Sequence, residues 1–125
     1  MKYLIATLAL AATFTADAAC VDYGPASLTG RIVRQTYAGP PDYESVTKGD
    51  QPIVIYVLQL DYTLCLNESQ VVGQGIREMQ LQWSGAGPGP FQDLLGRKVT
   101  AIGELIRGGA RDDKRVVLVA TKITT

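Results

Sequence analysis

Two segments of this chain share the pattern apolar-x-Gly-x-apolar: Leu28-Thr29-Gly30-Arg31-Ile32 and Ala101-Ile102-Gly103-Glu104-Leu105. In the first segment, the apolar residues alternate with polar ones, which predicts a β-strand with one buried face. A glycine inside a strand has no side chain to pack, and it is common where a sheet bends sharply, as at the corner of a small barrel. The two glycines therefore favour a strongly curved sheet.

The rest of the chain adds three more strand-like segments and one short helical one. The predicted strands cover residues 28–37, 53–60, 77–83, 99–106 and 116–123. Phe91, Leu94 and Leu95 have the spacing of one buried helical face, and Gly96 ends this helix after about two turns at most. This order predicts an all-β domain, a small five-stranded, OB-like, partly open barrel with one short helix between strands 3 and 4. A flat meander or a small sandwich is the alternative.

The composition of these segments indicates which parts are buried. Residues 53–55, Ile-Val-Ile, are apolar on both sides, so we expect this part of the strand to be covered on both faces. Trp83 keeps phase with Met79 and Leu81, which predicts a place in the core. Residues 61–75 are expected to form a connection that contains Cys65, and residues 107–114 a polar turn.

The amino terminus has the features of an export signal. Lys2 precedes an apolar run over residues 4–14, and Ala16-Asp17-Ala18 offers the small-x-small pattern of a cleavage site. The run is shorter than the roughly 20 residues that span a bilayer. We therefore predict a signal peptide over residues 1–18, a single domain over residues 19–125, and a periplasmic or secreted location. The mature chain would have about 107 residues, which suits one compact domain.

The export prediction bears on the two cysteines, Cys20 and Cys65. In an oxidising compartment they are expected to form a disulfide, which closes a loop of about 46 residues and stabilises the fold by about 4 kcal/mol. In the alternative, Cys20 becomes a lipidated amino terminus. Asp17 disfavours that alternative, because lipoprotein signals usually have Leu or a similar apolar residue three positions before the cysteine.

Charge and composition exclude several classes of function. The sequence has 12 basic and 12 acidic residues, which argues against phosphate-backbone binding as the main task and makes a nucleic-acid partner improbable. Residues 97–115 are mildly basic, which is usual for a solvated face. Since there is no histidine, Ser-His and Cys-His dyads are excluded, and we expect no cofactor and no metal site. No later stretch of the chain is long enough to be a transmembrane segment.

Two apparent catalytic patterns have simpler explanations. Ser45-Val46-Thr47-Lys48 matches the S-x-x-K pattern of serine acyl-enzymes, but it lies in a Gly/Pro-rich loop rather than on a buried helix. Asp42, Glu44 and Asp50 offer paired carboxylates, yet they share that one loop, whereas glycosidases usually place theirs across a deep cleft. We therefore predict no catalytic residues and no enzyme activity.

The chain resembles a bacterial family of exported or membrane-anchored proteins, domain of unknown function 4431. The resemblance rests on Leu28-Thr29-Gly30, on residues 39–45 with Gly49-Asp50, on residues 57–60 followed by Cys65, and on residues 95–99 leading to Gly103-Glu104-Leu105. It covers most of the mature chain, and it implies a similar small exported β domain with no established activity. Family members often have a histidine-rich turn where this chain has residues 107–114. If that turn binds metal in relatives, the ability is absent here.

The most plausible interaction surface is the loop 38–50, which is long for a hairpin connection and flanks the ligand face of OB-folds. Proline stiffens it, and tyrosines are common at contact surfaces. Alternatively, Tyr43 folds back and covers the open end of the barrel. The candidate ligand- or partner-binding residues are Tyr37, Pro40, Pro41, Asp42, Tyr43, Glu44 and Asp50.

These features predict a non-catalytic binding domain of the bacterial cell envelope, which contacts an envelope protein or a small ligand through loop 38–50 and the adjacent barrel face. One alternative is an inhibitor or immunity protein for a periplasmic or secreted hydrolase, because an acidic loop suits a basic cleft. Another is an OB domain that binds oligosaccharide or nucleic acid.

Overall fold

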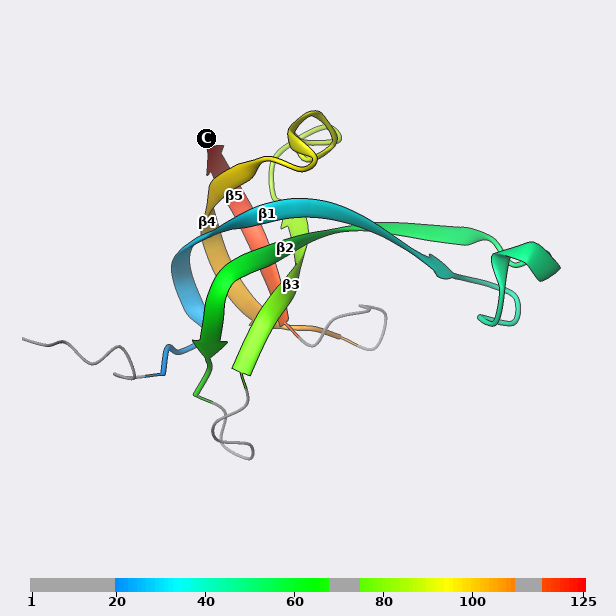
Figure 1. The fold of residues 1–125 in the computed structure, drawn as a ribbon, viewed down its shortest axis with the longest axis horizontal. Coiled ribbons are helices and arrows are strands. Elements are labelled where there is room, and N and C mark those ends of the chain that lie inside the picture. The colour runs from blue at the N-terminus through cyan, green and yellow to red at the C-terminus, as the bar shows by residue number, and fades with distance from the viewer. Residues whose placement is uncertain (1–19, 68–74, 110–115) are drawn as a thin grey trace, which may run out of the picture.

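A computed structural model describes residues 20–67, 75–109 and 116–125 as a five-stranded sheet that closes on itself (Figure 1). The strand order is β1-β2-β3-β5-β4, and β4 pairs back with β1. All pairs are antiparallel except β3 and β5, which are parallel. This confirms the predicted small all-β barrel. The predicted signal peptide lies outside the described residues, as does most of the predicted turn 107–114. The strands are β1 (Gly24–Ala38), β2 (Pro52–Cys65), β3 (Gly75–Trp83), β4 (Lys98–Arg107) and β5 (Val116–Thr124).

Gly30 and Gly103 lie where neighbouring strands come closest. A Cβ atom on Gly30 would lie 2.2 Å from the carbonyl oxygen of Gln59 in β2. A Cβ atom on Gly103 would lie 2.0 Å from the carbonyl oxygen of Val119 in β5. The ladder between β4 and β5 also shifts register between Ile102 and Gly103. Both glycines are therefore required by backbone approach, whereas the sequence pattern predicted them as sites where the sheet bends sharply.

The barrel interior is filled by alternate residues of every strand. Trp83 is partly buried and packs against this core, with its ring edge-on to Phe91 at a centroid distance of 6.0 Å. Among the described residues, no helix is long or apolar enough to cross a bilayer. The largest fully buried side chains are Ile32, Leu58, Met79, Leu105 and Leu118, followed by several valines.

The predicted helix at 91–95 is a single 3-10 turn, η2 (Gln92–Leu94). The prediction of its contacts was right, because Phe91 is buried and Leu94 and Leu95 pack against the core. A short helical segment of at most two turns is present between β3 and β4, as predicted, but it is a 3-10 turn rather than an α-helix. Pro90 and Gly96 enclose only five residues, too few to repeat the α-helical hydrogen bond. Together with the preceding loop, η2 covers one end of the barrel (Figure 1).

The loop before η2 packs closely on the tryptophan ring. A Cβ atom on Gly89 would lie 2.6 Å from Cγ of Trp83, and one on Gly85 would lie 2.8 Å from its Nε1. Gly89 also has φ = +78°, a conformation that L side chains rarely adopt. The glycines of this loop therefore allow the backbone to lie directly against the indole.

Cys20 and Cys65 form a disulfide, as the sequence predicted. The prediction of a connection from residue 61 was wrong, because β2 continues through an irregular register between Gln59 and Leu64 and ends at Cys65. Val21 forms a parallel bridge with Leu66, and its N–H donates to the carbonyl of Cys65 at 2.9 Å. The disulfide thus fastens the segment before β1 to the end of β2.

Candidate functional site

The loop 38–50 is the end of a projecting arm. We use "arm" for residues 33–55, the part of the β1–β2 hairpin beyond Ile32, which is a core residue and is the last residue of β1 bonded on the β4 side. The ladder between β1 and β4 ends at the pair Arg31–Lys98, whereas β1 and β2 stay paired as far as Ala38 and Pro52. Six residue steps at about 3.3 Å give this extension a length of about 20 Å. Figure 1 shows the arm reaching well beyond the barrel, with η1 (Val46–Lys48) at its end.

The carboxylate of Asp50 organises the tip, which we define as residues 39–51. It accepts hydrogen bonds from the backbone N–H groups of Asp42 at 3.0 Å, Glu44 at 2.8 Å and Ser45 at 2.9 Å. Asp50 is only 4% exposed. These donors, with Asp42 the strongest and then Ser45 and Glu44, hold the pKa of Asp50 below its ordinary value. Asp50 is therefore a structural centre of the tip rather than a contact residue.

Four backbone hydrogen bonds close the tip around this carboxylate. Gly39 N–H donates to the Gln51 carbonyl at 2.7 Å, and Gln51 N–H donates to the Pro40 carbonyl at 2.8 Å. Tyr43 N–H donates to Gly39 at 2.9 Å, and Asp50 N–H donates to Ser45 at 3.3 Å. The tip is thus a closed, hydrogen-bonded unit, and Pro40 and Pro41 lie exposed on it with a cis peptide bond between them.

Tyr43 is presented to solvent by this unit. Its side chain is 66% exposed, and its backbone has φ = 55°, in the left-handed region that non-glycine residues seldom adopt. The alternative that Tyr43 covers the open end of the barrel is wrong, because the side chain is exposed and the arm carries it away from the barrel (Figure 1). Asp42 and Glu44 are exposed beside it.

Tyr37 does not belong to the tip surface. It is half-buried, and its hydroxyl donates to Oε1 of Gln35 at 2.6 Å. The amide of Gln35 in turn reaches Glu78 of β3 at 3.5 Å. Of the seven predicted site residues, the structure brings Pro40, Pro41, Asp42, Tyr43 and Glu44 together at the surface, places Asp50 beneath them, and leaves Tyr37 on the strand.

The arm also exposes apolar side chains that sequence reasoning assigned to the interior. Ile53 is 36% exposed and Val54 is 39% exposed, so the prediction that 53–55 is covered on both faces holds only for Ile55. In the described chain these two residues pair with β1 but not with β3, because the ladder between β2 and β3 ends at Tyr56 and Leu81. Val46, 43% exposed, adds an apolar side chain at the tip.

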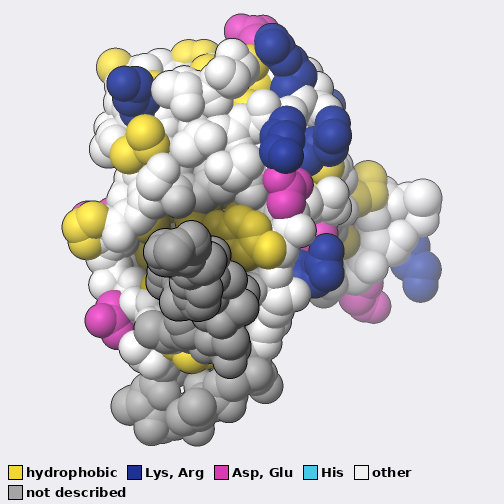
Figure 2. Space-filling model, turned by 60° about the vertical axis from the view of Figure 1, so that its left-hand side comes forward, with side chains coloured by type: hydrophobic (Ala, Val, Ile, Leu, Met, Phe, Trp, Pro, Cys, Tyr) yellow, Lys and Arg dark blue, Asp and Glu magenta, His cyan; other side chains and the backbone are white. Residues whose placement is uncertain are grey.

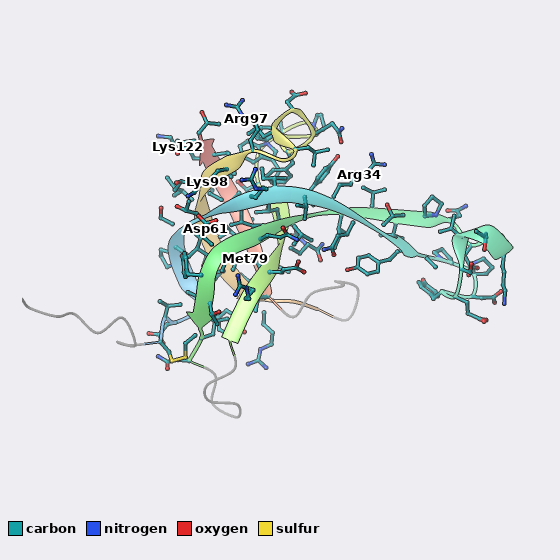
Figure 3. All side chains as sticks on the ribbon, viewed as in Figure 1. Arg34, Asp61, Met79, Arg97, Lys98 and Lys122 are labelled. Carbon is teal, nitrogen blue, oxygen red and sulfur yellow. A yellow bond between two sulfur atoms is a disulfide. The ribbon has the colours of Figure 1, made fainter. Side chains whose placement is uncertain are left out.

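A basic surface lies where the arm leaves the barrel. We call this surface the basic root; it consists of four exposed residues, Arg31, Arg34, Arg97 and Lys98. Arg31 and Lys98 are direct cross-strand partners, and the guanidinium of Arg31 donates to the carbonyl of Gly96. The Lys98 ammonium lies 2.9 Å from the Asp61 carboxylate. Figure 2 shows Lys and Arg side chains gathered on one side of this face, and Figure 3 shows Lys98 and Asp61 close together with Arg97 and Arg34 above β1.

Other candidate sites in the described chain offer less. A shallow pocket of about 370 Å³ is lined by Gln59, Leu60, Arg77 and Glu78, but Gln59 donates to Glu78 across it at 3.0 Å. The hydroxyl of Ser45 pairs with that of Thr47 at 2.7 Å on the exposed tip. Within residues 20–67, 75–109 and 116–125, no three potential metal ligands come together.

Asp50→Asn tests the role assigned to this carboxylate. Since its pKa is lowered on folding, its stabilising contribution is present above its ordinary pKa near 3.8 and is lost as the pH falls through the lowered value. We expect the protection factors of the Asp42, Glu44 and Ser45 amides to fall in the wild type as the pH drops below 3.8 through the lowered pKa of Asp50, and to be low at all pH values in Asp50→Asn. Hydrogen exchange followed by NMR measures this.

Barrel amides provide the internal control for this experiment, because they should keep their protection in the variant. A tip whose three amides exchange equally in wild type and Asp50→Asn at pH 7 would contradict the assignment.

The family models, the curated proteins and the solved structures compared with this chain gave no match. The resemblance to domain of unknown function 4431 therefore stays a prediction.

Proposed function

We propose that this protein is an exported, non-catalytic binding domain of the bacterial cell envelope, and that its contact surface is the tip of the arm. One observation supports the proposal above the others: Tyr43 is 66% exposed on a loop that Asp50 holds in one closed conformation. A large ring on a backbone that is already ordered loses only the freedom of its two side-chain torsions when a partner covers it, which favours binding.

The position of the tip further supports this proposal. The arm holds the tip about 20 Å from the barrel, so a partner can surround it on several sides without contacting the barrel. The disulfide supports the exported location, because such bonds persist in oxidising compartments. The contact surface therefore centres on Asp42, Tyr43, Glu44 and the exposed Val46, and the barrel serves as the platform from which the arm projects.

The test compares Tyr43→Ala with Tyr62→Ala, a variant of another exposed tyrosine, 42% exposed, on the barrel part of β2. We expect both variants to melt within a few degrees of wild type, because neither ring belongs to the buried core. Quantitative mass spectrometry after capture from envelope extract should show a partner retained by wild type and Tyr62→Ala and lost with Tyr43→Ala. The identified partner is then purified, and its Kd for Tyr43→Ala should rise at least tenfold.

A partner that binds Tyr43→Ala as tightly as wild type would remove the tip from the proposal. Mass spectrometry of the native protein tests the exported location. A mature chain that begins after residue 18 with an intact disulfide is expected, whereas an acylated Cys20 or two free thiols would contradict it.

The shape of the arm also favours a second candidate function, inhibition of a periplasmic or secreted hydrolase. A narrow two-stranded arm that ends in Asp42 and Glu44 suits insertion into a basic active-site cleft. In that case Asp42→Asn with Glu44→Gln should abolish inhibition of the target in a panel of envelope hydrolases. If no enzyme in the panel is inhibited, the inhibitor function is excluded and the binding-domain proposal is the one that stands.

A further inference from the structure

The free edge of β1 along the arm has hydrogen-bonding groups directed outward. Ile32 N–H donates to the carbonyl of Arg97 at 3.3 Å, and the Ile32 carbonyl accepts from Gly96 N–H at 2.8 Å, so both groups of Ile32 face the β4 side. In an antiparallel strand, alternate residues direct their backbone groups to the same side. Arg34, Thr36 and Ala38 therefore direct theirs to this edge, and no strand in the described parts of the chain pairs with it beyond Arg31.

The opposite edge of the arm is a poorer template for another strand. The ladder between β1 and β2 places Val54 opposite Thr36 and Pro52 opposite Ala38, so these residues direct their backbone groups to the β3 side. Pro52 has no N–H to donate, and a proline at this position is a common way to protect a sheet edge. The unprotected edge of the arm is thus that of β1.

The edge of β1 is complementary to itself. If two arms meet antiparallel around a two-fold axis at Thr36, then Thr36 faces Thr36 of the second copy, and Arg34 faces its Ala38. The three outward-directed residues of each copy then form six N–H···O=C bonds across the axis. Gln35 faces Tyr37 of the second copy, so no like charges lie opposite one another, which would destabilise such a pair.

The charges of the arm also suit this arrangement. The tip has three carboxylates and one ammonium, whereas the basic root contributes four cations with Asp61 as counterion. In the same register, Ala38 of the second copy lies opposite Arg34, two residues from Ile32, where Gly96 and Arg97 occupy the β1 edge. Each acidic tip therefore arrives at the basic root of the other copy, where Arg31 and Lys98 already lie opposite each other as like charges.

From these observations we infer that two copies of this chain associate through the β1 edges of their arms, which joins the two hairpins into a four-stranded sheet with an acidic tip at each basic root. The inference does not depend on the proposed partner of the tip. Tyr43→Ala removes no outward backbone N–H of β1 and no charge of the tip, so the β1 edges should still pair and failure of one proposal is distinguishable from failure of the other.

The first experiment is analytical ultracentrifugation of the mature chain with its disulfide intact, from 1 to about 500 µM, a range that includes the affinities of weak interfaces. Thr36→Pro removes the central outward N–H, and Val54→Pro removes the equivalent N–H on the other edge. Neither of these two N–H groups donates within the β1–β2 ladder, so the substitutions leave the bonds of the hairpin in place. We expect wild type and Val54→Pro to dimerise alike and Thr36→Pro to raise the dimer Kd at least tenfold. A wild type that is monomeric throughout, or a dimer lost with Val54→Pro alone, would overturn the inference.

A second experiment does not depend on proline and therefore still tests the inference if Thr36→Pro fails to fold. Residues in a hydrogen-bonded antiparallel pair have Cα atoms about 5.5 Å apart, within the range of a disulfide. Thr36→Cys should therefore yield a covalent dimer under mild oxidation, whereas Gln35→Cys, which faces residue 37, should not. Peptide mapping must show the Cys20–Cys65 bond unchanged. Equal cross-linking of both variants, or of neither, would contradict the register.

Discussion

Gly103→Ala is expected to destabilise the barrel by about 3 kcal/mol, at the upper end of the usual range for overpacked sites. The new Cβ would lie 2.0 Å from the Val119 carbonyl oxygen and 2.8 Å from Cα of Ala120. Both obstacles are backbone atoms, so no side-chain rotation can relieve the clash. The strands β4 and β5 would have to separate at their register shift. Urea unfolding monitored by circular dichroism measures the loss in free energy of unfolding.

Two further variants show whether steric approach is the cause. Gly30→Ala should cost a similar amount, because its Cβ would lie 2.2 Å from the Gln59 carbonyl oxygen. At Gly87, φ is +78° and nothing lies within 4 Å, so Gly87→Ala isolates conformational strain, about 1 kcal/mol. If Gly87→Ala and Gly103→Ala proved equally costly, close approach of the strands would not explain the glycines.

Removal of the disulfide is expected to cost about 4 kcal/mol, the chain-entropy value for a loop of this length. Small domains are commonly stable by only 5–15 kcal/mol, so the Cys20→Ser, Cys65→Ser variant should unfold far more readily. The segment before β1 would then be held mainly by the Val21–Leu66 bridge and by the Asn67 side chain, which donates to Asp22 at 2.9 Å. Denaturation in guanidinium chloride measures the effect.

A reductant supplies the control for the disulfide prediction. It should destabilise wild type by the same amount as the double substitution and leave the double variant unchanged. A loss below about 1 kcal/mol in both measurements would mean that the bridge constrains little of the unfolded chain.

The barrel could be predicted from the sequence because its determinants are local. Alternation over residues 28–33 identified the buried face of β1, and glycines at positions 30 and 103 indicated a strongly curved sheet, although the close backbone approach at each of them is visible only in the structure. Contacts of Phe91 were predicted correctly from spacing, but the helix type was not. The spacing of the apolar residues indicates which side chains contact the core, whereas the number of residues between Pro90 and Gly96 decides whether an α-helix can form.

The arm and the organisation of its tip could not be predicted. Alternation along a strand does not show where its neighbours stop, so Ile53 and Val54 looked like interior residues although β3 does not reach them. The sequence predicts Asp50 as a contact residue, but its partners are backbone N–H groups, which every loop residue except proline provides. Only the three-dimensional path of the loop shows which carboxylate they surround. A Gly-Asp pair at the end of a long hairpin loop is the one signal that pointed there.

The placement of Trp83 has a practical consequence for spectroscopy. It is the only tryptophan in the sequence, and it lies between the glycine loop and Phe91 at the closed end of the barrel, on β3 rather than on the arm. The fluorescence of this indole should therefore change when the barrel unfolds, and it should not change when a partner covers Tyr43. Titrations of the tip will need an extrinsic dye or tyrosine emission as their optical probe.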